Sequence, residues 1–368
     1  SLFGPFFSSS SKGIHMFPIN DSAGILFILA GNAALWFFLE KHTKWKVFHF
    51  FPPLIFIYLI PGILSNTGVL PLKDPTYSWM RHNLLPAFLV LLLLDVDVRG
   101  ASRVMGRGLL VMFAGTLGVV IGGPIAFALV KGFLSEGAWK GFGALAGSWI
   151  GGTGNMAAVG GGLETSSKHF GLAIIADHAI YLVWLPLLLY SKSLAPWFHR
   201  MTGASQEHLD KLKQAAEELV VDKGRPEMWH ILLLLALAFG ATFLANTIAP
   251  LLPVVKPVLG KSTYTILLVT TFGLILSQSP ARKIPGSHIL SMAMVYLFVA
   301  RMGATASIQG LAGEALPFVA GAFVWILIHG AFLLLAAKLL HADVHTTAIA
   351  SAANIGGAAS APVVAAYH

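Results

Sequence analysis

Polar side chains that could bind a cation or a small polar solute are concentrated in two glycine-rich stretches of an otherwise apolar chain. The first stretch, residues 147–161, reads GSWIGGTGNMAAVGG and carries six glycines. The second stretch, residues 352–361, contains NIGGAAS. The neutral oxygens of the two stretches and their surroundings belong to Ser148, Thr153, Asn155, Thr347, Asn354 and Ser360. Oxygens of this kind suit sodium or the polar groups of a substrate.

The glycines predict an interrupted backbone in both stretches, because a helix tolerates glycine badly, at about 1 kcal/mol relative to alanine. The glycines at the two expected breaks are Gly151, Gly152, Gly154, Gly356 and Gly357. Non-helical backbone at membrane depth is tolerated only where it lines a cavity or is buried in protein. Freed carbonyl groups could bind cations, and freed N–H groups could bind anions. Two such breaks that meet near the bilayer midplane predict the binding site of a secondary transporter.

Close helix packing is the alternative explanation for the same glycines, since small residues let membrane helices approach each other. GGTGNMAAVGGG could serve that purpose alone. The amide and hydroxyl side chains, which packing does not need, and the occurrence of two stretches favour the binding-site interpretation.

Asp177 lies in the middle of the apolar run LAIIADHAIYLVW, where a carboxylate costs roughly 2.5 kcal/mol or more. It is a candidate to bind sodium or to carry a proton, and a structural pair with a buried histidine or arginine is the alternative. His178 points about 100° away from it on a helix and is expected to be packed. Asp177 with Thr153, Asn155 and Asn354 forms the predicted sodium site.

Four further charged residues stay open. Arg301, in YLFVARMGATAS, could hold a substrate carboxylate through a bidentate contact, pair with an aspartate, or extend to the membrane surface. Asp95 and Asp97 end the run LLLLDVDV and are expected at a solvated helix end. Glu164 ends the first glycine-rich element, either as an edge carboxylate or as a cation ligand.

The composition predicts a polytopic, all-α membrane protein. The 368 residues are 56% hydrophobic and 11% charged, with a mean hydropathy of +0.76, whereas a soluble domain carries about 25% charged residues. Continuous runs such as WILIHGAFLLLAAKLL do not fit the short alternating strands of a membrane β-barrel. The chain has no cysteine and a formal charge of +8. The basic residues lie between apolar runs, where they set orientation rather than bind nucleic acid.

Apolar runs repeat along the chain in a matching order. A shift of about 205 residues places five runs of the first half on five runs of the second half, and it aligns Ile150 with Ile355. The chain is expected to divide into a tail (1–21), a first repeat (22–192), a cytoplasmic amphipathic linker (193–226) and a second repeat (227–368) whose last helix is missing.

Basic loops set the expected orientation, because positive residues favour the cytoplasmic side. The loop residues concerned are Lys41, Lys44 and Lys46, and Arg99, Arg103 and Arg107. If residues 138–164 form a re-entrant hairpin, both loops and the linker lie inside and the two halves are inverted. A broken helix that crosses the membrane is the alternative.

Catalytic motifs are missing from the sequence. It contains no nucleophile elbow, no Walker loop and no H-E-x-x-H zinc motif, and the histidines have no metal-ligand spacing. Neither an enzyme nor an ATP-driven pump is expected, and sodium is the only ion expected as a cofactor.

Five segments, LSNTGVLP, LLLLDVDVR, GSWIGGTGNMAAV, ADHAIYLVW and NIGGAASAPVVAA, resemble the YjcL-like membrane proteins, the family called domain of unknown function 819. The resemblance covers about residues 22 to 368. The family is grouped with the cation:proton antiporter and anion transporter superfamily, so it implies inverted repeats, a dimerising scaffold domain and a mobile core domain. Two crossed discontinuous elements would correspond to Ser148 to Asn155 and Asn354 to Ser360, and Asp177 would belong to the core.

The residues and the resemblance together predict a secondary active transporter in the bacterial inner membrane. It would couple sodium or proton movement to transport of a small organic anion by alternating access, as a homodimer. A sodium/proton exchanger is one alternative, although such relatives use two neighbouring membrane carboxylates and only Asp177 is central here. A non-transporting membrane scaffold or receptor is the other alternative.

Overall fold

A computed structural model describes residues 19–43, 45–50, 52–94, 98–204, 224–255, 260–306 and 311–367. Within these ranges the chain is helical and contains no β-strand, which confirms the all-α prediction. Most of the expected tail, Asp95 and Asp97, and residues 205–223 of the expected linker lie outside the described residues. For residues 357–363 only the backbone is described, so the structure says nothing of the Ser360 side chain.

The helices follow the apolar runs of the sequence. Their bounds are α1 Ser22–Thr43, α2 Val47–Phe50, α3 Pro53–Asn66, α4 Pro75–Trp79, α5 Leu85–Leu94, α6 Val98–Val130, α7 Ala138–Gly151, α8 Thr153–Gly162, α9 Ser167–Tyr190, α10 Ala195–Thr202, α12 Met228–Ile248, α13 Lys261–Ser277, α14 Ser287–Ala304, α15 Leu311–Leu339 and α16 Val344–Tyr367. A π-helical turn, Met80–Leu84, joins α4 to α5.

Six helices in the described part of the chain are long and apolar enough to cross a membrane. They cover Ser22–Thr43, Gly108–Phe133, Ser167–Thr202, Met228–Leu251, Ser287–Ala304 and Gly313–Leu339. Two shorter apolar helices, Pro53–Asn66 and Lys261–Ser277, accompany them. The chain is therefore an integral, multi-pass membrane protein.

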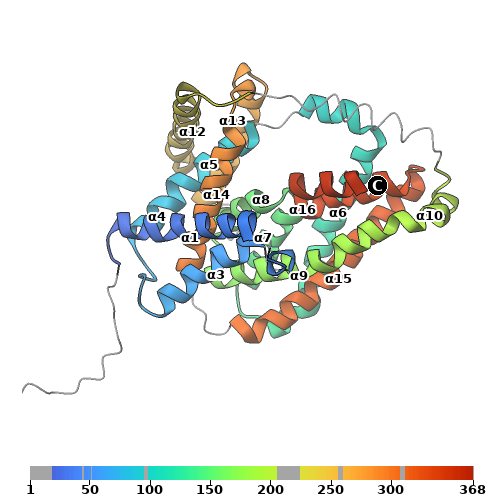
Figure 1. Cartoon of the computed structure of the whole chain (residues 1–368), viewed down its shortest axis with the longest axis horizontal. Coiled ribbons are helices and arrows are strands. Elements are labelled where there is room, and N and C mark those ends of the chain that lie inside the picture. Colours follow the sequence, from blue (N-terminus) through green and yellow to red (C-terminus); the bar gives the residue numbers. More distant parts are fainter. Residues whose placement is uncertain are drawn as a thin grey trace, which may run out of the picture.

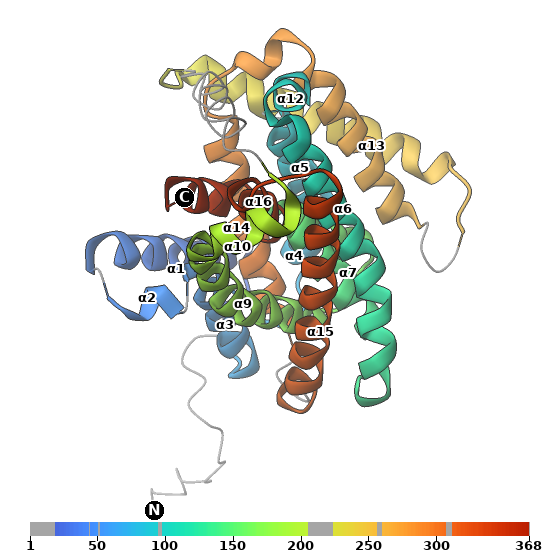
Figure 2. The ribbon, with the colours of Figure 1, turned by 90° about the vertical axis from the view of Figure 1, so that its right-hand side faces the viewer.

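The helices pack in two groups (Figure 1). Group A consists of α1, α3, α4, α5, α12, α13 and α14, which contact one another. Group B consists of α6, α7, α9, α15 and α16, and Figure 2 shows α15 running beside α6. α8 packs closely on α7 of group B and also contacts α5, α13 and α14 of group A. α8 and the start of α9 therefore form the junction between the groups.

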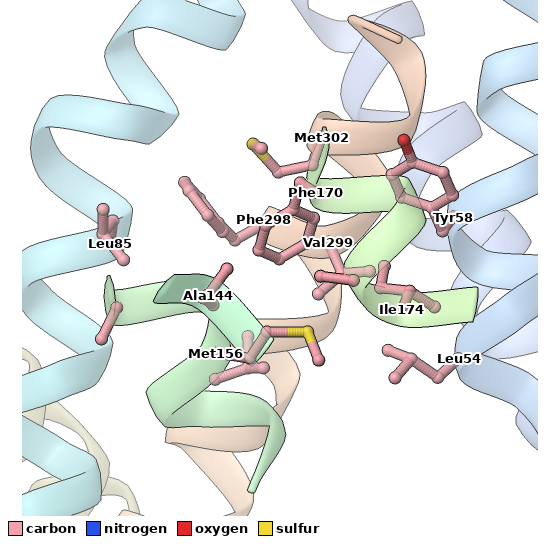
Figure 3. Packing of buried hydrophobic residues seen from close by; sticks show 14 of the residues in the cluster. Leu54, Tyr58, Leu85, Ala144, Met156, Phe170, Ile174, Phe298, Val299 and Met302 are labelled. Atoms are coloured by element: carbon pink, nitrogen blue, oxygen red, sulfur yellow. The ribbon is translucent and has the colours of Figure 1, made fainter. Parts of the chain in front are cut away.

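The largest apolar cluster lies at this junction (Figure 3). It brings together Leu54 and Tyr58 of α3, Phe298 of α14, Met156 of α8 and Phe170 of α9. Apolar contact between the groups is continuous here, so burial of side chains rather than a specific polar lock holds most of the junction together.

α7 and α8 form an antiparallel helical hairpin that turns at Gly152. Gly152 has φ 86° and ψ −170°, a conformation open essentially only to glycine. Gly147 packs on the far arm, because an added methyl group would lie 2.7 Å from the Asn155 carbonyl oxygen. A methyl group on Gly160 would meet the Ala144 Cβ at 3.4 Å. The break predicted in the first glycine-rich stretch is therefore present, and other glycines of that stretch bring the two arms together.

The break predicted in the second stretch is wrong. α16 runs without interruption from Val344 to Tyr367 and includes Asn354, Gly356 and Gly357. Residues 344–367 contain nine alanines and only two glycines, whereas residues 138–162 contain nine glycines. Alanine has the highest helix propensity of all residues, so its abundance outweighs the cost of one glycine pair.

Candidate functional site

The carboxylate of Asp177 binds the last turn of α7, directly before the break. Ser148 Oγ donates to one carboxylate oxygen at 3.1 Å, and the indole Nε1 of Trp149 donates to the other at 2.9 Å. The structure thus brings together Asp177 and Ser148, two of the predicted site residues. Both donors are neutral, so they orient the carboxylate without compensating its charge. His178 instead bonds the carbonyl of Ile174 with Nδ1 at 2.8 Å, as expected for a packed histidine.

The break leaves backbone donors at the start of α8. Gly152 closes α7 by donating its N–H to the Ser148 carbonyl at 2.7 Å, and Met156 donates to the Gly152 carbonyl at 3.1 Å. The N–H groups of Thr153, Gly154 and Asn155 belong to the first turn, which has no side-chain cap and no partner within its own helix. A methyl group on Gly151 would overlap the side-chain amide of Asn155, so the Asn155 side chain lies against the end of α7.

Asn354 lies on α16 and bonds α6 rather than the hairpin. With its amide oriented to satisfy both ends, the nitrogen donates to the carbonyls of Ala350 at 2.9 Å and Met112 at 3.2 Å. The oxygen accepts from the Thr116 hydroxyl at 2.8 Å. None of the hydrogen bonds between described residues joins Asn354 to Asp177. Asp177 and Asn354, two of the four residues of the predicted sodium site, are thus bonded to different helices, α7 and α6.

A buried histidine network links the helices of group B, and the sequence analysis missed it. His329 of α15 is fully buried, with Nδ1 2.9 Å from the Gly115 carbonyl and Nε2 3.1 Å from Ser351 Oγ. Trp184 donates its Nε1 to the same hydroxyl at 2.8 Å. The hydroxyl proton of Ser351 is then free to donate to Nε2, so the Nδ1 of His329 carries the ring proton.

The network lies on the same face of α9 as Asp177, since Asp177 and Trp184 are seven residues, about two turns, apart. Trp149 and Trp325 connect the two polar clusters through ring contact, with centroids 4.7 Å apart. An isolated histidine inside WILIHGAFLLL was the signal in the sequence, because an ionisable residue within a membrane span is by default a candidate for function.

Arg301 and Glu164 lie elsewhere, at the far end of α8 from the break. Both line a cavity of about 440 Å³ between the groups, here named the outer cavity, together with Arg81 and Tyr77. Gly160 and Gly161 also line it, eight or nine residues after Gly152, which is about 12–14 Å along a helix. Arg301 therefore does not contact the break, and of its three expected roles the pair with an aspartate is not found among the described residues.

Glu164 joins the groups at this end. Arg81 Nη2 lies 2.9 Å from its Oε1, and Ser262 Oγ donates to the same oxygen at 2.8 Å. Burial alone would raise the pKa of Glu164, but the Ser262 hydrogen bond and the charges of Arg81 and Lys140 outweigh it and lower the pKa below its ordinary value. The carboxylate is thus ionised over the physiological range.

Clusters of three or more histidine, cysteine, aspartate or glutamate side chains that could hold a metal ion are absent from the described ranges. A sodium site made of hydroxyl and carbonyl oxygens with one carboxylate is of a different type. Asp177, Ser148 and the carbonyl groups at the end of α7 are the described groups that fit such a site.

Comparisons with known proteins agree with the earlier resemblance. A family model described as "Protein of unknown function (DUF819)" matches residues 27–368. The uncharacterized membrane protein YjcL of Bacillus subtilis (strain 168) is 24% identical over 363 residues, which cover 94% of this chain and 89% of YjcL. No solved structure matches the chain.

Proposed function

This chain belongs to the DUF819 family of membrane proteins, and we propose that it is a secondary active transporter. It moves a small organic anion together with sodium or protons by alternating access. The observation that carries the proposal is the glycine break at the tip of the α7–α8 hairpin, with the carboxylate of Asp177 bonded to its last helical turn. Discontinuous helices whose free backbone groups line a site near the bilayer midplane are a common feature of secondary transporters, and in this chain the first repeat supplies the break while α16 of the second repeat is continuous.

The helix contacts of the first half of the chain recur in the second half, which supports two related repeats. The shift of about 205 residues pairs α1 with α12, α3 with α13, α5 with α14, α6 with α15, and the hairpin with α16. Contacts repeat under this exchange, since α1 packs on α3 and α14 as α12 packs on α13 and α5. The pairs α5·α14, α6·α15 and α7·α16 contact each other across the centre. This pattern is what a two-fold relation between repeats produces.

The hairpin geometry favours inverted rather than parallel repeats. The two arms, of 14 and 10 residues, turn back on each other at Gly152, so the hairpin enters and leaves on the same side. A hairpin that re-enters places the loop around Lys41, the first turns of α6 around Arg103, which are helical rather than the expected loop, and the linker on the cytoplasmic side. The first half then crosses with α1, α3, α5, α6 and α9, an odd number, which inverts the second half relative to the first.

The same orientation places the outer cavity on the side opposite to the basic loops. α1 ends inside at the loop around Lys41, α3 returns to the outside at Asn66, and the cavity begins at Leu72. The described conformation is therefore open between the groups on the outer side. In the proposed cycle, group B shifts against group A and carries the hairpin between the two sides of the membrane.

Asp177 is the proposed coupling residue, either as a sodium ligand with Ser148 or as a proton carrier. A bound cation would neutralise the carboxylate and so lower the cost of moving it past the apolar junction. The second predicted element, α16, contributes Asn354 from an unbroken helix and lies against α7. A homodimer in the bacterial inner membrane, with group A as the stationary scaffold, completes the proposal.

Uptake into proteoliposomes tests the proposed function. Purified protein is reconstituted, and uptake of radiolabelled carboxylates is measured with an inward sodium gradient, an inward proton gradient or no gradient. One of the two gradients should accelerate uptake. Equal uptake with and without both gradients would contradict coupling. Sodium-driven proton release, read with an internal pH dye in the absence of any carboxylate, would favour the exchanger.

A further inference from the structure

The outer cavity holds a guanidinium group that lacks a counterion. Arg301 lies on the last turn of α14, where its Nε donates to the Tyr77 carbonyl at 3.1 Å and its Nη1 to the Met302 sulfur at 3.0 Å. Its Cζ lies 5.7 Å from the centre of the Phe298 ring. Among the ion pairs between described residues, none includes Arg301. The group is held in place by weak and neutral partners only.

The free edge of this guanidinium has the geometry of an anion receptor. A guanidinium group has five N–H donors, and the two contacts above use two of them, so three remain for a ligand. The two terminal nitrogens can bind both oxygens of a carboxylate or phosphate at once. A half-buried charge is costly when no partner compensates it, and an incoming anion removes that cost.

Tyr77 supplies a second, independent indication of a ligand. Its side chain is 2% exposed, lines the cavity, and its hydroxyl has no hydrogen-bond partner among the described residues. A buried hydroxyl without a partner is costly, and hydroxyl groups of this kind are usually bonded to protein or to a bound molecule. The first turn of α9 also faces the cavity through Ser166 and Ser167, and a helix N-terminus favours anions.

The acidic residues that line the outer cavity accept hydrogen bonds from groups other than Arg301. Glu164 accepts from Arg81 and Ser262, as described above. Asp74 caps α4 by accepting the N–H of Thr76 at 2.8 Å. Neither carboxylate bonds Arg301, so the cavity keeps a positive group that its own acids do not satisfy.

We propose that the outer cavity binds the carboxylate or phosphate group of a small anion, with Arg301 as the bidentate partner and Tyr77 as a hydroxyl donor. The site is an entry site, separated from the hairpin tip by most of the length of α8. The inference deepens the proposed function and rests on it for one point only, that the bound anion is the one carried. The shared ligand chemistry also fits the phosphate headgroup of an anionic lipid.

Binding to the purified full chain tests the proposal without any transport. The protein is placed in phosphatidylcholine nanodiscs and titrated calorimetrically with succinate and with inorganic phosphate. A parallel set of nanodiscs contains phosphatidylglycerol, whose retention on the protein is read by native mass spectrometry. Variants that retain the wild-type elution volume in gel filtration are compared.

The binding of at least one of the three probes, succinate, inorganic phosphate or phosphatidylglycerol, should depend on Arg301. Arg301→Gln should weaken its binding by about tenfold or more, and Arg301→Lys by several-fold, because lysine cannot make the bidentate contact. Tyr77→Phe should weaken it by about two- to tenfold, as the loss of one hydrogen bond does. Arg200→Gln, on the exposed face of α10, should bind as the wild type does and serves as the matched control.

The outcomes distinguish a soluble anion from a lipid headgroup, and they test the anion site separately from the proposed transport function. Dependence of succinate or phosphate binding on Arg301 identifies a soluble anion, and dependence of phosphatidylglycerol retention alone identifies a lipid headgroup. The proposal is overturned if none of the three probes binds more weakly to Arg301→Gln than to the wild type. Binding that depends on Arg301 in a protein that fails the uptake assay would keep this site and reject the transporter.

Discussion

At the scale of single residues, the hydrogen-bond partners of the Asp177 carboxylate indicate its role. Its carboxylate has two neutral donors from α7 and forms no ion pair with another described residue. A purely structural aspartate inside a membrane is expected to pair with a cation. A carboxylate beside a broken helix, with no ion pair among the described residues, is what the proposed cation site requires.

Replacement of Asp177 by asparagine should remove coupling while the fold persists. Asparagine has nearly the same size and keeps one acceptor, but it can neither be charged nor release a proton. We expect gradient-driven uptake in proteoliposomes to fall by tenfold or more, since a bound cation loses a charge-assisted ligand. Ser148→Ala removes one hydrogen bond from a neutral donor, worth about 0.5–1.5 kcal/mol, and should reduce the uptake less than Asp177→Asn does. Gradient-driven uptake by Asp177→Asn at the wild-type rate would contradict this role.

The Glu164–Arg81 pair predicts a pH dependence of the junction. Because the folded-state pKa of Glu164 is lower than its ordinary value of 4.5, ionisation stabilises the folded state fully above that ordinary value. The contribution is lost as the pH falls through the lower folded value. The difference in Tm between wild type and Glu164→Gln should therefore be constant from neutral pH to about pH 5 and shrink below about pH 4. A difference that stays the same at pH 3 would show that the pair contributes nothing to stability.

At the scale of elements, the backbone break predicted from the sequence is present in the first glycine-rich stretch and absent from the second. Both stretches have a glycine pair after an isoleucine, at Gly151 and Gly356, and the pattern alone does not distinguish them. Their flanking residues decide the backbone, because glycines flank the first pair and alanines the second. A count of helix propensity over the whole segment would have predicted the unbroken α16.

Side-chain contacts between helices were harder to predict from the sequence than the helices themselves. The mid-span position of Asp177 indicated a buried site, and the structure places it at the hairpin. The partner of His329 is a serine 22 residues further along, on another helix, and nothing in local spacing predicts that contact. Arg301 was recognised as a candidate, but its place in the outer cavity follows from the packing of α14 against α3 and α5.

Substitution of Gly152 by any residue with a side chain should destabilise the hairpin tip. Its positive φ and extended ψ fall in a region that costs other residues roughly 1–3 kcal/mol. Gly152→Ala should lower the Tm in detergent and reduce uptake. Gly240→Ala is the matched control, because Gly240 lies in α12 with open space around it and alanine raises helix propensity there. Equal Tm values for the two variants would contradict the strained turn.

At the scale of the whole molecule, the contacts between the groups fall into two kinds. The apolar contacts of the junction have no fixed direction, so they permit sliding. The polar contacts gather at the outer end, where Thr263 donates to the Gly162 carbonyl at 3.0 Å and the hydroxyls of Ser167 and Thr305 lie 2.6 Å apart. A rearrangement of the groups must break these polar contacts, which are few and replaceable by water.

The absence of cysteine from the sequence makes disulfide locking the most direct test of movement between the groups. Ser167→Cys with Thr305→Cys places two thiols across the junction, and Ser22→Cys with Thr76→Cys places two within group A, where the parent hydroxyls are 2.8 Å apart. Gradient-driven uptake is measured in proteoliposomes after oxidation and again after reduction. The account predicts that oxidation abolishes uptake only in the cross-junction pair and that reduction restores it. Full uptake by the oxidised, quantitatively cross-linked Ser167–Thr305 pair would contradict alternating access by relative movement of the two groups.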